Sequence, residues 1–405
     1  MSDDVVAPER SEPSAPSAAA HTRETHEPPE RDITDGGPDM VQFLDAEGRR
    51  VPDTDVNRPY AEYADELDGD ALRALYRDLV LVRRIDAEGY ALQRQGELGL
   101  WPSLLGQEAA QVGPGRAMRP QDYAFPGYRE HGIAWCKGVD PVNLLGLFRG
   151  VNHGGWDSNE NNFHLYTIVI GNQMLHATGY AMGVQRDGAV GTGDPDRDTA
   201  VMAFTGDGGI AQGDFNEALV FASVAHAPVV FYVQNNHWAI SEPNERQFTV
   251  PPYQRAYGFG LPGVRVDGND AVACYAVTKA ALERARSGQG PTLIEAFTYR
   301  MGAHTTSDDP TKYRIEAEVE AWRRKDPVDR MRKHLTAEGL ADEDWLAELD
   351  AEADELAARV RRECQQMPNP PHEAMFEHVY VDPHPLVARE RDEFAAYVAG
   401  FEEEE

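Results

Sequence analysis

The strand–helix–strand pattern between residues 199 and 236 constrains the fold of this chain more than any other segment. Residues 199–205 are short and apolar, and residues 228–234 form a second run rich in β-branched and aromatic side chains. Between them, residues 214–225 carry apolar side chains at helical spacing. A unit of this length places its two strands parallel and adjacent. The segment therefore predicts an α/β fold built on a parallel sheet.

Glycines and polar residues stand where each of these two strands ends. Gly206-Asp207-Gly208 follows the first strand, and Asn235-Asn236 follows the second. The carboxyl ends of parallel strands meet at one edge of the sheet, where open α/β sheets bind ligands, so Asp207 and Asn236 are expected to lie close together. Either segment alone would be an ordinary turn. A carboxylate and an amide together, beside glycines, predict a site for Mg²⁺ and a diphosphate.

A dinucleotide fingerprint competes with this interpretation. Gly206, Gly208 and Ala211 satisfy G-x-G-x-x-G/A between a strand and a helix. That fingerprint requires an acidic residue at the end of the second strand to hold ribose hydroxyls, but this strand ends in Gln234-Asn235-Asn236. The carboxylate inside the turn would also repel a pyrophosphate unless a cation lay between them. The sequence therefore favours a metal site over an NAD-binding oxidoreductase.

The rest of the chain alternates strand and helix patterns, which predicts a mostly parallel sheet with helices on both faces. Residues 40–51 are expected to form a small hairpin or an extended arm, and residues 150–173 a loop near the site. Further strands are predicted at 263–266 and 291–299, and helices at 70–95, 106–118, 141–149, 175–184, 271–287, 316–335 with a break at Pro327, 344–366 and 387–400. We expect three parts: a disordered acidic tail at 1–38, an α/β domain with an N-terminal arm at 39–335, and a helical C-terminal extension at 336–405.

The composition argues against several classes of partner. A formal net charge of -31 speaks against nucleic acid and anionic membranes. The sequence has no run of about 18 apolar residues, as a membrane-spanning helix requires. Cys136, Cys274 and Cys364 lie far apart without a CxxC pair, which indicates a reducing compartment and neither a disulfide framework nor a zinc site. The N-terminal residues fit neither a signal nor a transit peptide. We therefore expect a cytoplasmic protein.

Several long segments together resemble one enzyme family. The stretch GDGGIAQGDFNEALVFASVAHAPVVFYVQNNHWAIS is similar to the thiamine-diphosphate motif of the 2-oxo acid dehydrogenase E1 α subunits. QRQGELGLWPSLLGQEAAQVG, DYAFPGYREHG, IVIGNQMLHATGYAMG, YRMGAHTTSDDPTKYR and WRRKDPVDRMRKHL resemble further segments of that family, in the family's order. The resemblance covers roughly residues 40–380. It implies the thiamine-diphosphate-binding fold, in its diphosphate-binding form, with thiamine diphosphate and Mg²⁺ as cofactors.

The resemblance also implies a role for each matching residue. Asp207 and Asn236 would bind Mg²⁺ through their side chains and Trp238 through its backbone carbonyl, with diphosphate oxygens and water completing the octahedron that Mg²⁺ demands. Arg129 would hold diphosphate oxygens through its planar guanidinium. His304 matches a histidine near the reacting centre and is the expected catalytic residue. The remaining positions expected to bind the cofactor are Tyr128, Ile170, Gly206, Gly208 and Gly209.

The sequence does not decide the roles of four further residues. Thr305 matches a serine that is phosphorylated in mitochondrial relatives, where a phosphate would repel the cofactor's diphosphate. His131 is either a cofactor neighbour or a structural histidine. His153 and His164 lie in the loop at 150–173, which differs from the glycine-rich version usual in the family, and either is equally well a local surface histidine.

The implied partners follow from what the chain lacks. Single-chain thiamine enzymes carry separate diphosphate and pyrimidine domains of about 150–200 residues each. This chain is expected to hold one sheet domain, so another polypeptide should supply the pyrimidine half. The resemblance implies an E1 β subunit in an α₂β₂ heterotetramer, and the lipoyl domain of E2 as acceptor of the acyl group.

The substrate implied by the resemblance is a 2-oxo acid. FLDAEGRRV and DDPTKYR favour pyruvate, oxidatively decarboxylated with transfer of the acyl group to lipoyl-E2. AHTTSDD is also similar to the branched-chain enzymes, whose substrate is 3-methyl-2-oxobutanoate. One methylene in a pocket changes binding by only about 1–3 kcal/mol, so a few side chains decide between them. The alternatives of another class are the NAD-binding oxidoreductase and a non-catalytic partner subunit.

Overall fold

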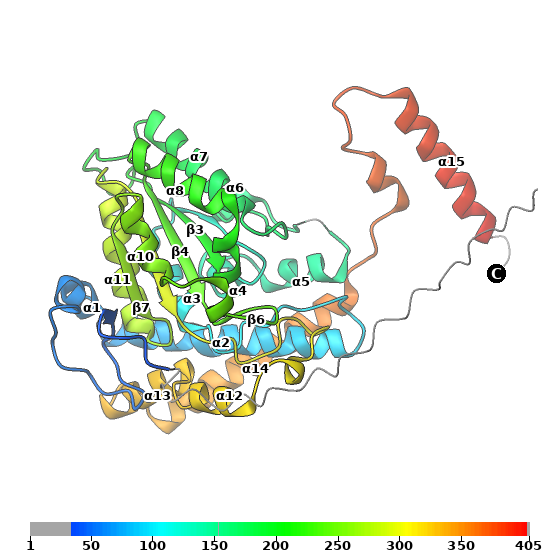
Figure 1. Ribbon diagram of the computed structural model, residues 1–405. Coiled ribbons are helices and arrows are strands. Elements are labelled where there is room, and N and C mark those ends of the chain that lie inside the picture. The colour runs from blue at the N-terminus through cyan, green and yellow to red at the C-terminus, as the bar shows by residue number, and fades with distance from the viewer. Residues whose placement is uncertain (1–33, 153, 403–405) are drawn as a thin grey trace, which may run out of the picture.

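A six-stranded parallel sheet forms the centre of the molecule in the computed structural model, which describes residues 34–152 and 154–402 (Figure 1). The strand order is β1-β7-β8-β4-β3-β2, and every neighbouring pair is parallel. The strands are β1 Met40–Val41, β2 Tyr123–Phe125, β3 Val201–Gly206, β4 Val229–Asn235, β7 Gly263–Asp267 and β8 Thr292–Phe297, with a separate antiparallel pair β5 Trp238–Ala239 and β6 Glu242–Pro243. The predicted parallel α/β fold is confirmed.

Helices cover both faces of this sheet, because successive side chains of each buried strand point to opposite sides. Val201 and Ala203 of β3 pack on one side with helices α7, α8 and α10, whereas Met202 and Phe204 pack on the other with α2, α3 and α11. The helices are α1 Ala61–Asp65, α2 Gly69–Arg94, α3 Ala109–Ala117, α4 His131–Cys136, α5 Pro141–Arg149, α6 Ser158–Asn161, α7 Asn172–Arg186, α8 Gly213–Ala225, α9 Asn244–Gln247, α10 Pro252–Gly258, α11 Ala271–Arg286, α12 Glu316–Arg323, α13 Pro327–Ala337, α14 Glu343–Gln366 and α15 Pro385–Glu402, with 3-10 turns η1 Arg58–Tyr60, η2 Asp207–Ala211, η3 Pro310–Lys312 and η4 His372–Phe376.

The strand–helix–strand unit singled out in the sequence folds as predicted. β3 and β4 pair in parallel from Val201 opposite Val229 to Gly206 opposite Gln234. The 3-10 turn η2 follows β3 directly, and α8 begins only at Gly213. The residues after β3 and β4 therefore emerge side by side at one edge of the sheet.

The N-terminal segment contains the small hairpin expected for it and, before the hairpin, an edge strand that was not expected. Residues 40–41 form β1, the edge strand of the main sheet, parallel to β7. Leu44 and Arg50 form an antiparallel bridge, so a tight bend of the hairpin kind follows the strand. The carboxylate of Asp270 accepts hydrogen bonds from the backbone amides of Phe43 and Leu44 at 2.7 and 2.6 Å, which holds this segment against the start of α11. The expected tail at 1–38 lies mostly in residues 1–33, outside the described part of the chain.

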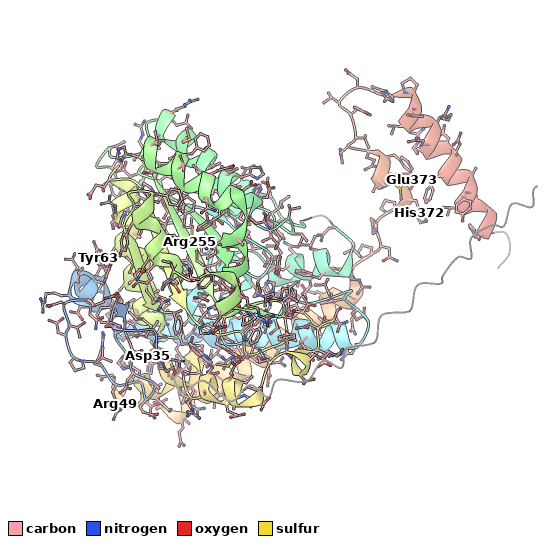
Figure 2. The ribbon with its side chains drawn as sticks, viewed as in Figure 1. Asp35, Arg49, Tyr63, Arg255, His372 and Glu373 are labelled. Atoms are coloured by element: carbon pink, nitrogen blue, oxygen red, sulfur yellow. The ribbon has the colours of Figure 1, made fainter. Side chains whose placement is uncertain are left out.

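The C-terminal residues form a long helix and then an arm. The helix predicted over 316–335 is divided at Pro327, where the side chain of Asp326 caps the first turn of α13. After α14, η4 and α15 extend away from the body as an arm (Figure 1), and Figure 2 shows His372 and Glu373 of this arm far from Arg255 of the body. Within the arm, Phe394 packs against Phe376 and His372.

No helix within residues 34–152 or 154–402 is long and apolar enough to span a membrane.

Candidate cofactor site

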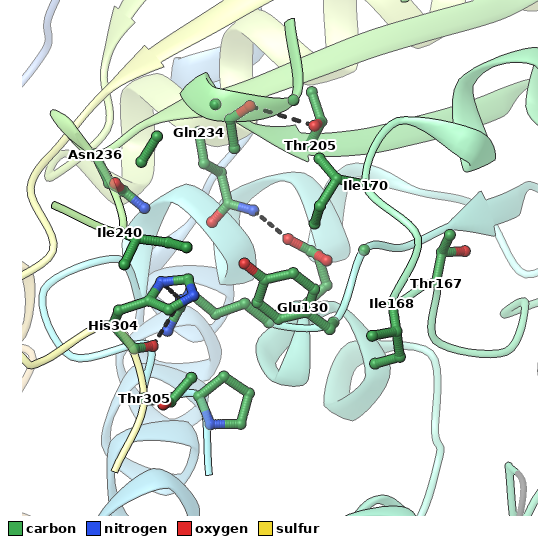
Figure 3. Close-up of a pocket in the computed structure, with 18 of the residues that line it drawn as sticks. Glu130, Thr167, Ile168, Ile170, Thr205, Gln234, Asn236, Ile240, His304 and Thr305 are labelled. Carbon is green, nitrogen blue, oxygen red and sulfur yellow. Dashed lines mark hydrogen bonds between the residues drawn. The ribbon is translucent and has the colours of Figure 1, made fainter. Parts of the chain in front are cut away.

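A cavity of about 780 Å³ lies at the carboxyl edge of the sheet, where β3, β4 and β8 end (Figure 3). It brings together every residue that the sequence assigned to a cofactor: Tyr128, Arg129, Ile170, Gly206, Asp207, Gly208, Gly209, Asn236, Trp238 and His304. Thr305 also lines it. Figure 3 shows His304 and Thr305 on one side of the cavity, with Ile168 and Ile170 across from them.

Asp207 is a buried carboxylate at the floor of the cavity. One of its oxygens accepts a hydrogen bond of 2.9 Å from the side-chain amide of Gln247. Burial raises the pKa of Asp207 to about 6, against the opposing effects of this hydrogen bond and of the nearby Arg300 guanidinium. The carboxyl is therefore mostly ionised at neutral pH although it is buried, which is the condition under which a bound cation would stabilise it.

Asn236 and Trp238 bring two further oxygen atoms to the same floor. The Asn236 amide nitrogen donates to the side chain of Gln107 at 2.9 Å, so its oxygen is the atom left to face a cation, and the Trp238 amide lies 3.3 Å from that oxygen. The Trp238 carbonyl accepts a 2.9 Å hydrogen bond from Arg300. His237 between them has a positive φ of 72°, the left-handed conformation that turns the chain so sharply here.

His304 lies between two arginines. Its Nδ1 is 3.3 Å from a guanidinium nitrogen of Arg129 and 3.4 Å from one of Arg300. A guanidinium can only donate, so Nδ1 accepts and the proton of the neutral ring resides on Nε2. Burial, together with these two cations, lowers the pKa of His304 to about 3. In the protein without a bound anion, His304 is therefore a neutral imidazole.

Arg300 is the residue of this site that the sequence analysis missed. It is buried, lines the cavity, and donates to the carbonyls of Trp238 and Ile240. Burial, followed by the neighbouring Arg129, lowers the pKa of Arg300 to about 10, so it remains a cation. Arg300 lies three residues beyond the end of β8, and β8 is the neighbour of β4 in the sheet, a placement that depends on pairing between distant strands.

The three glycines at the end of β3 and in the turn after it, Gly206, Gly208 and Gly209, have different surroundings. A Cβ atom at Gly209 would lie 2.0 Å from the Thr205 hydroxyl, and one at Gly208 would lie 2.8 Å from the Cβ of Ala239. Both positions need glycine because the protein itself crowds them. At Gly206 the space that a Cβ would enter is open, so here the backbone is accessible to a ligand.

The histidines whose roles the sequence did not decide lie in different surroundings. His131 is buried, stacks on Trp101 at 4.3 Å between ring centroids, and contacts the Tyr166 hydroxyl at 2.7 Å through Nδ1. Burial lowers its pKa to about 3, and it is not among the residues that line the cavity. His164 packs its ring on Phe125. His153 falls outside the described residues.

One wall of the cavity, called the apolar wall below, is apolar and open toward solvent. Leu100, Leu147 and Phe148 line it together with Ile168 and Ile170. Ile168 is 59% exposed, and the adjacent Val169 is 71% exposed. Such a wall can pack against an aromatic ring, but it does not enclose one.

The residues present fit a diphosphate-bearing cofactor with an attached ring system. Oxygen atoms suited to Mg²⁺ lie beside two arginines and an open glycine backbone. Four buried polar atoms of residues that line the cavity have no hydrogen-bond partner within the described parts of the chain, namely Gln107 Nε2, Glu130 Oε2, Gln173 Oε1 and Arg300 Nε. Buried polar groups of this kind are normally satisfied, so they indicate a missing ligand or water.

The chain belongs to the family described as Dehydrogenase E1 component, which matches residues 76–375, and within it to the α subunits of 2-oxo acid dehydrogenases. It is 42% identical over 367 residues to the 3-methyl-2-oxobutanoate dehydrogenase subunit alpha of Mycobacterium tuberculosis, which covers 89% of this chain and 96% of the relative. It is 38% identical over 308 residues to the pyruvate dehydrogenase E1 component subunit alpha of Staphylococcus epidermidis, covering 76% and 79%. The family implies thiamine diphosphate as cofactor and decides against the nicotinamide interpretation of Gly206, Gly208 and Ala211.

Proposed function

We propose that this chain is the diphosphate-binding half of an E1 enzyme that decarboxylates a 2-oxo acid and passes the acyl group to the lipoyl domain of E2. The observation that carries the proposal is the convergence of Asp207, Asn236 and Arg300 from the ends of three strands on one buried floor. We propose a cytoplasmic location as well, supported by three free cysteines.

Mg²⁺ would be held by the side-chain oxygens of Asp207 and Asn236 and by the carbonyl of Trp238. These are the hard oxygen ligands that Mg²⁺ prefers, and one carboxylate leaves charge to be supplied by the diphosphate. Arg129 and Arg300 would bind diphosphate oxygens, and the open backbone at Gly206 would allow their approach. Ile170 and Tyr128 would flank the ring system.

Bound thiamine diphosphate supplies a nucleophilic carbon and an electron sink for decarboxylation. The chain's own contribution is electrostatic and steric. Neutral His304 would donate its Nε2 proton in a hydrogen bond to the oxygen of the 2-oxo group, where negative charge develops. The apolar wall, including Ile168 and Phe148, would keep water from the reacting centre once a partner covers it.

The partner would be an E1 β subunit, in an α₂β₂ heterotetramer. Supporting this, Ile168 and Val169 expose apolar surface at the edge of the cavity, where a second protein would complete the enclosure. The sheet of this chain supplies the diphosphate floor, and the pyrimidine side would come from β. The alternative of a non-catalytic subunit predicts a complex that assembles but stays inactive when Asp207 is intact.

A branched-chain 2-oxo acid is our first candidate for the substrate, and pyruvate is the second. The branched-chain candidate is supported by the Mycobacterium tuberculosis relative and by the apolar wall around Leu100 and Phe148. Pyruvate is supported by the Staphylococcus epidermidis relative and by the segments FLDAEGRRV and DDPTKYR. Part of the pocket would belong to the β subunit.

Co-purification with the β chain, followed by decarboxylation assays, tests the proposal. With thiamine diphosphate and Mg²⁺ present, kcat/KM for 3-methyl-2-oxobutanoate should exceed that for pyruvate by about 10-fold or more, in line with ~1–3 kcal/mol for each methylene bound. A reversed ratio would assign pyruvate as substrate. Lack of activity toward every 2-oxo acid in a well-assembled complex would reject the catalytic role.

A further inference from the structure

A short surface segment is hydrogen-bonded to the residues that end three adjacent strands. This segment, residues 238–247, comprises β5, β6 and α9, and is called the clasp below. It follows β4 in sequence, folds back over the carboxyl edge of the sheet, and packs against η2, which follows β3. Its hydrogen bonds to the three strand ends differ in kind.

At the β8 end, the clasp is the acceptor. Arg300 donates to its backbone carbonyls at Trp238, at 2.9 Å, and Ile240, at 2.7 Å. At the other two strand ends, the clasp is the donor through side-chain amides of α9. Asn244 donates to the side-chain oxygen of Asn235 at 2.7 Å, and Gln247 donates to the carboxylate of Asp207 at 2.9 Å.

Gln247 is itself fixed from within the clasp. Its amide nitrogen also donates to the backbone carbonyl of Glu242 at 3.0 Å. The side chain therefore has one preferred position, and that position commits one oxygen of Asp207 to a hydrogen bond. Gln247 does not line the cofactor cavity, so it would act on the site through Asp207 and the clasp and not by touching a ligand.

We propose that Gln247 is a positioning residue for the cation: it holds the Asp207 carboxylate in the orientation in which Asp207 binds Mg²⁺. The inference rests on the proposed function, since it takes Asp207 as a cation ligand. Groups that hydrogen-bond to a metal-binding carboxylate orient it, and their loss typically weakens metal binding 10–100-fold. Without Gln247, the buried carboxylate would keep only the backbone hydrogen bonds of its own turn and would be less firmly oriented toward the cation.

Asn244 provides a matched comparison within the same helix. It makes the same kind of hydrogen bond from the same face of the clasp, but to Asn235, whose own amide is held by Glu295 at 2.7 Å. Loss of Asn244 loosens the clasp and removes a 3.5 Å contact to the Gln247 amide nitrogen, the longest of the three that this nitrogen makes, but it leaves the hydrogen bond from Gln247 to Asp207 in place. Loss of Gln247 loosens the clasp to a similar degree and also releases Asp207. The difference between the two losses isolates the positioning effect.

The test compares Q247M and N244L, each similar in size to the residue replaced but without its amide, in the complex with the β subunit. Mn²⁺ affinity in the presence of thiamine diphosphate is measured by electron paramagnetic resonance, and activity is measured against Mg²⁺ concentration. For Q247M we expect 10–100-fold weaker Mn²⁺ binding and a matching rise in the Mg²⁺ requirement, with kcat at saturating Mg²⁺ within about twofold of wild type. For N244L we expect an affinity within about twofold.

Two results would overturn the inference. One is an unchanged Mn²⁺ affinity in Q247M, and the other is an equal loss in Q247M and N244L, which would make the effect a general loosening of the clasp. Both would leave the proposed function standing, because wild type would still bind Mn²⁺ with the cofactor. If wild type itself failed to bind Mn²⁺ in the presence of thiamine diphosphate, the proposed function would fail first.

Discussion

The floor and the apolar wall of the cofactor cavity differ in burial and in polarity. Asp207, Asn236 and Arg300 of the floor are buried and hydrogen-bonded within this chain. Ile168 of the apolar wall and the adjacent Val169 are exposed. The floor follows from strands that this chain contains, so it is finished when the chain folds. Under the proposed function, the β subunit would complete the wall.

The largest expected effect on cofactor binding comes from removing the Asp207 carboxylate from the floor. In D207A, the proposed cation site loses its carboxylate ligand, so Mg²⁺-dependent binding of thiamine diphosphate to the complex should fall at least ~100-fold in isothermal titration calorimetry. D196A removes a carboxylate from an exposed loop and is the matched control, with binding unchanged. If D207A bound the cofactor as tightly as wild type, the floor would not be a cation site.

Charged substitutions on the exposed apolar wall should impair assembly with the β subunit but leave the folding of this chain intact. The double variant I168D/V169D places two charges on the exposed apolar edge, and burying them against a partner would be costly, so co-purification with the β subunit should drop at least 10-fold. The thermal midpoint of this chain alone should stay within about 2 °C, because neither side chain is part of its core. A351D, on an exposed turn of α14, is the control for added charge. Normal assembly of the double variant would contradict the assignment of this wall to the interface.

The surroundings of His304 predict an unusually low pKa for its ring. Because burial and the two arginines lower the pKa of His304 to about 3, its ring should stay neutral, with the proton on Nε2, as the pH falls from 8 to 5. The depressed pKa contributes stability above the ordinary imidazole pKa of about 6.5, and this contribution is lost as the pH falls toward 3. Nitrogen-15 NMR of histidine-labelled protein measures the tautomer, with H304Q identifying the resonance. R129M should raise this pKa, since it removes a neighbouring cation.

The smallest effect on this chain alone should come from removing the C-terminal arm. In the arm, α15 packs on η4 through Phe394 and exposes Tyr397 and Phe401. A chain ending at Met367 should therefore keep the thermal midpoint of the full chain within about 2 °C in calorimetry. A drop of more than 5 °C would place the arm, unlike the wall, among the parts that stabilise the body.

The sequence allowed the parts of the site with local signals to be predicted. The apolar runs and helical spacing between residues 199 and 236 fixed β3, α8 and β4, and parallel pairing then placed Asp207 beside Asn236. Arg300 was missed because its role depends on β8 lying next to β4, a pairing between strands far apart in the sequence. The two-residue strand β1 was missed for the same reason.

Gln247 shows the other limit of prediction from sequence. It lies on a four-residue helix with no apolar periodicity, and its contact with Asp207 depends on how the clasp folds back over the sheet. An amide in such a segment carries no sequence signal of its own. Residues that act through another side chain are visible only once the contact itself is seen.

Under the proposed function, this chain would supply a Mg²⁺-dependent diphosphate floor that becomes a cofactor site only with a partner. Calorimetric titration with thiamine diphosphate tests it directly, using this chain alone and the α–β complex, each with Mg²⁺ and with EDTA. We predict tight binding only for the complex with Mg²⁺, and binding at least 100-fold weaker in the other three cases. Equally tight binding by the chain alone, or binding that is indifferent to Mg²⁺, would contradict the account.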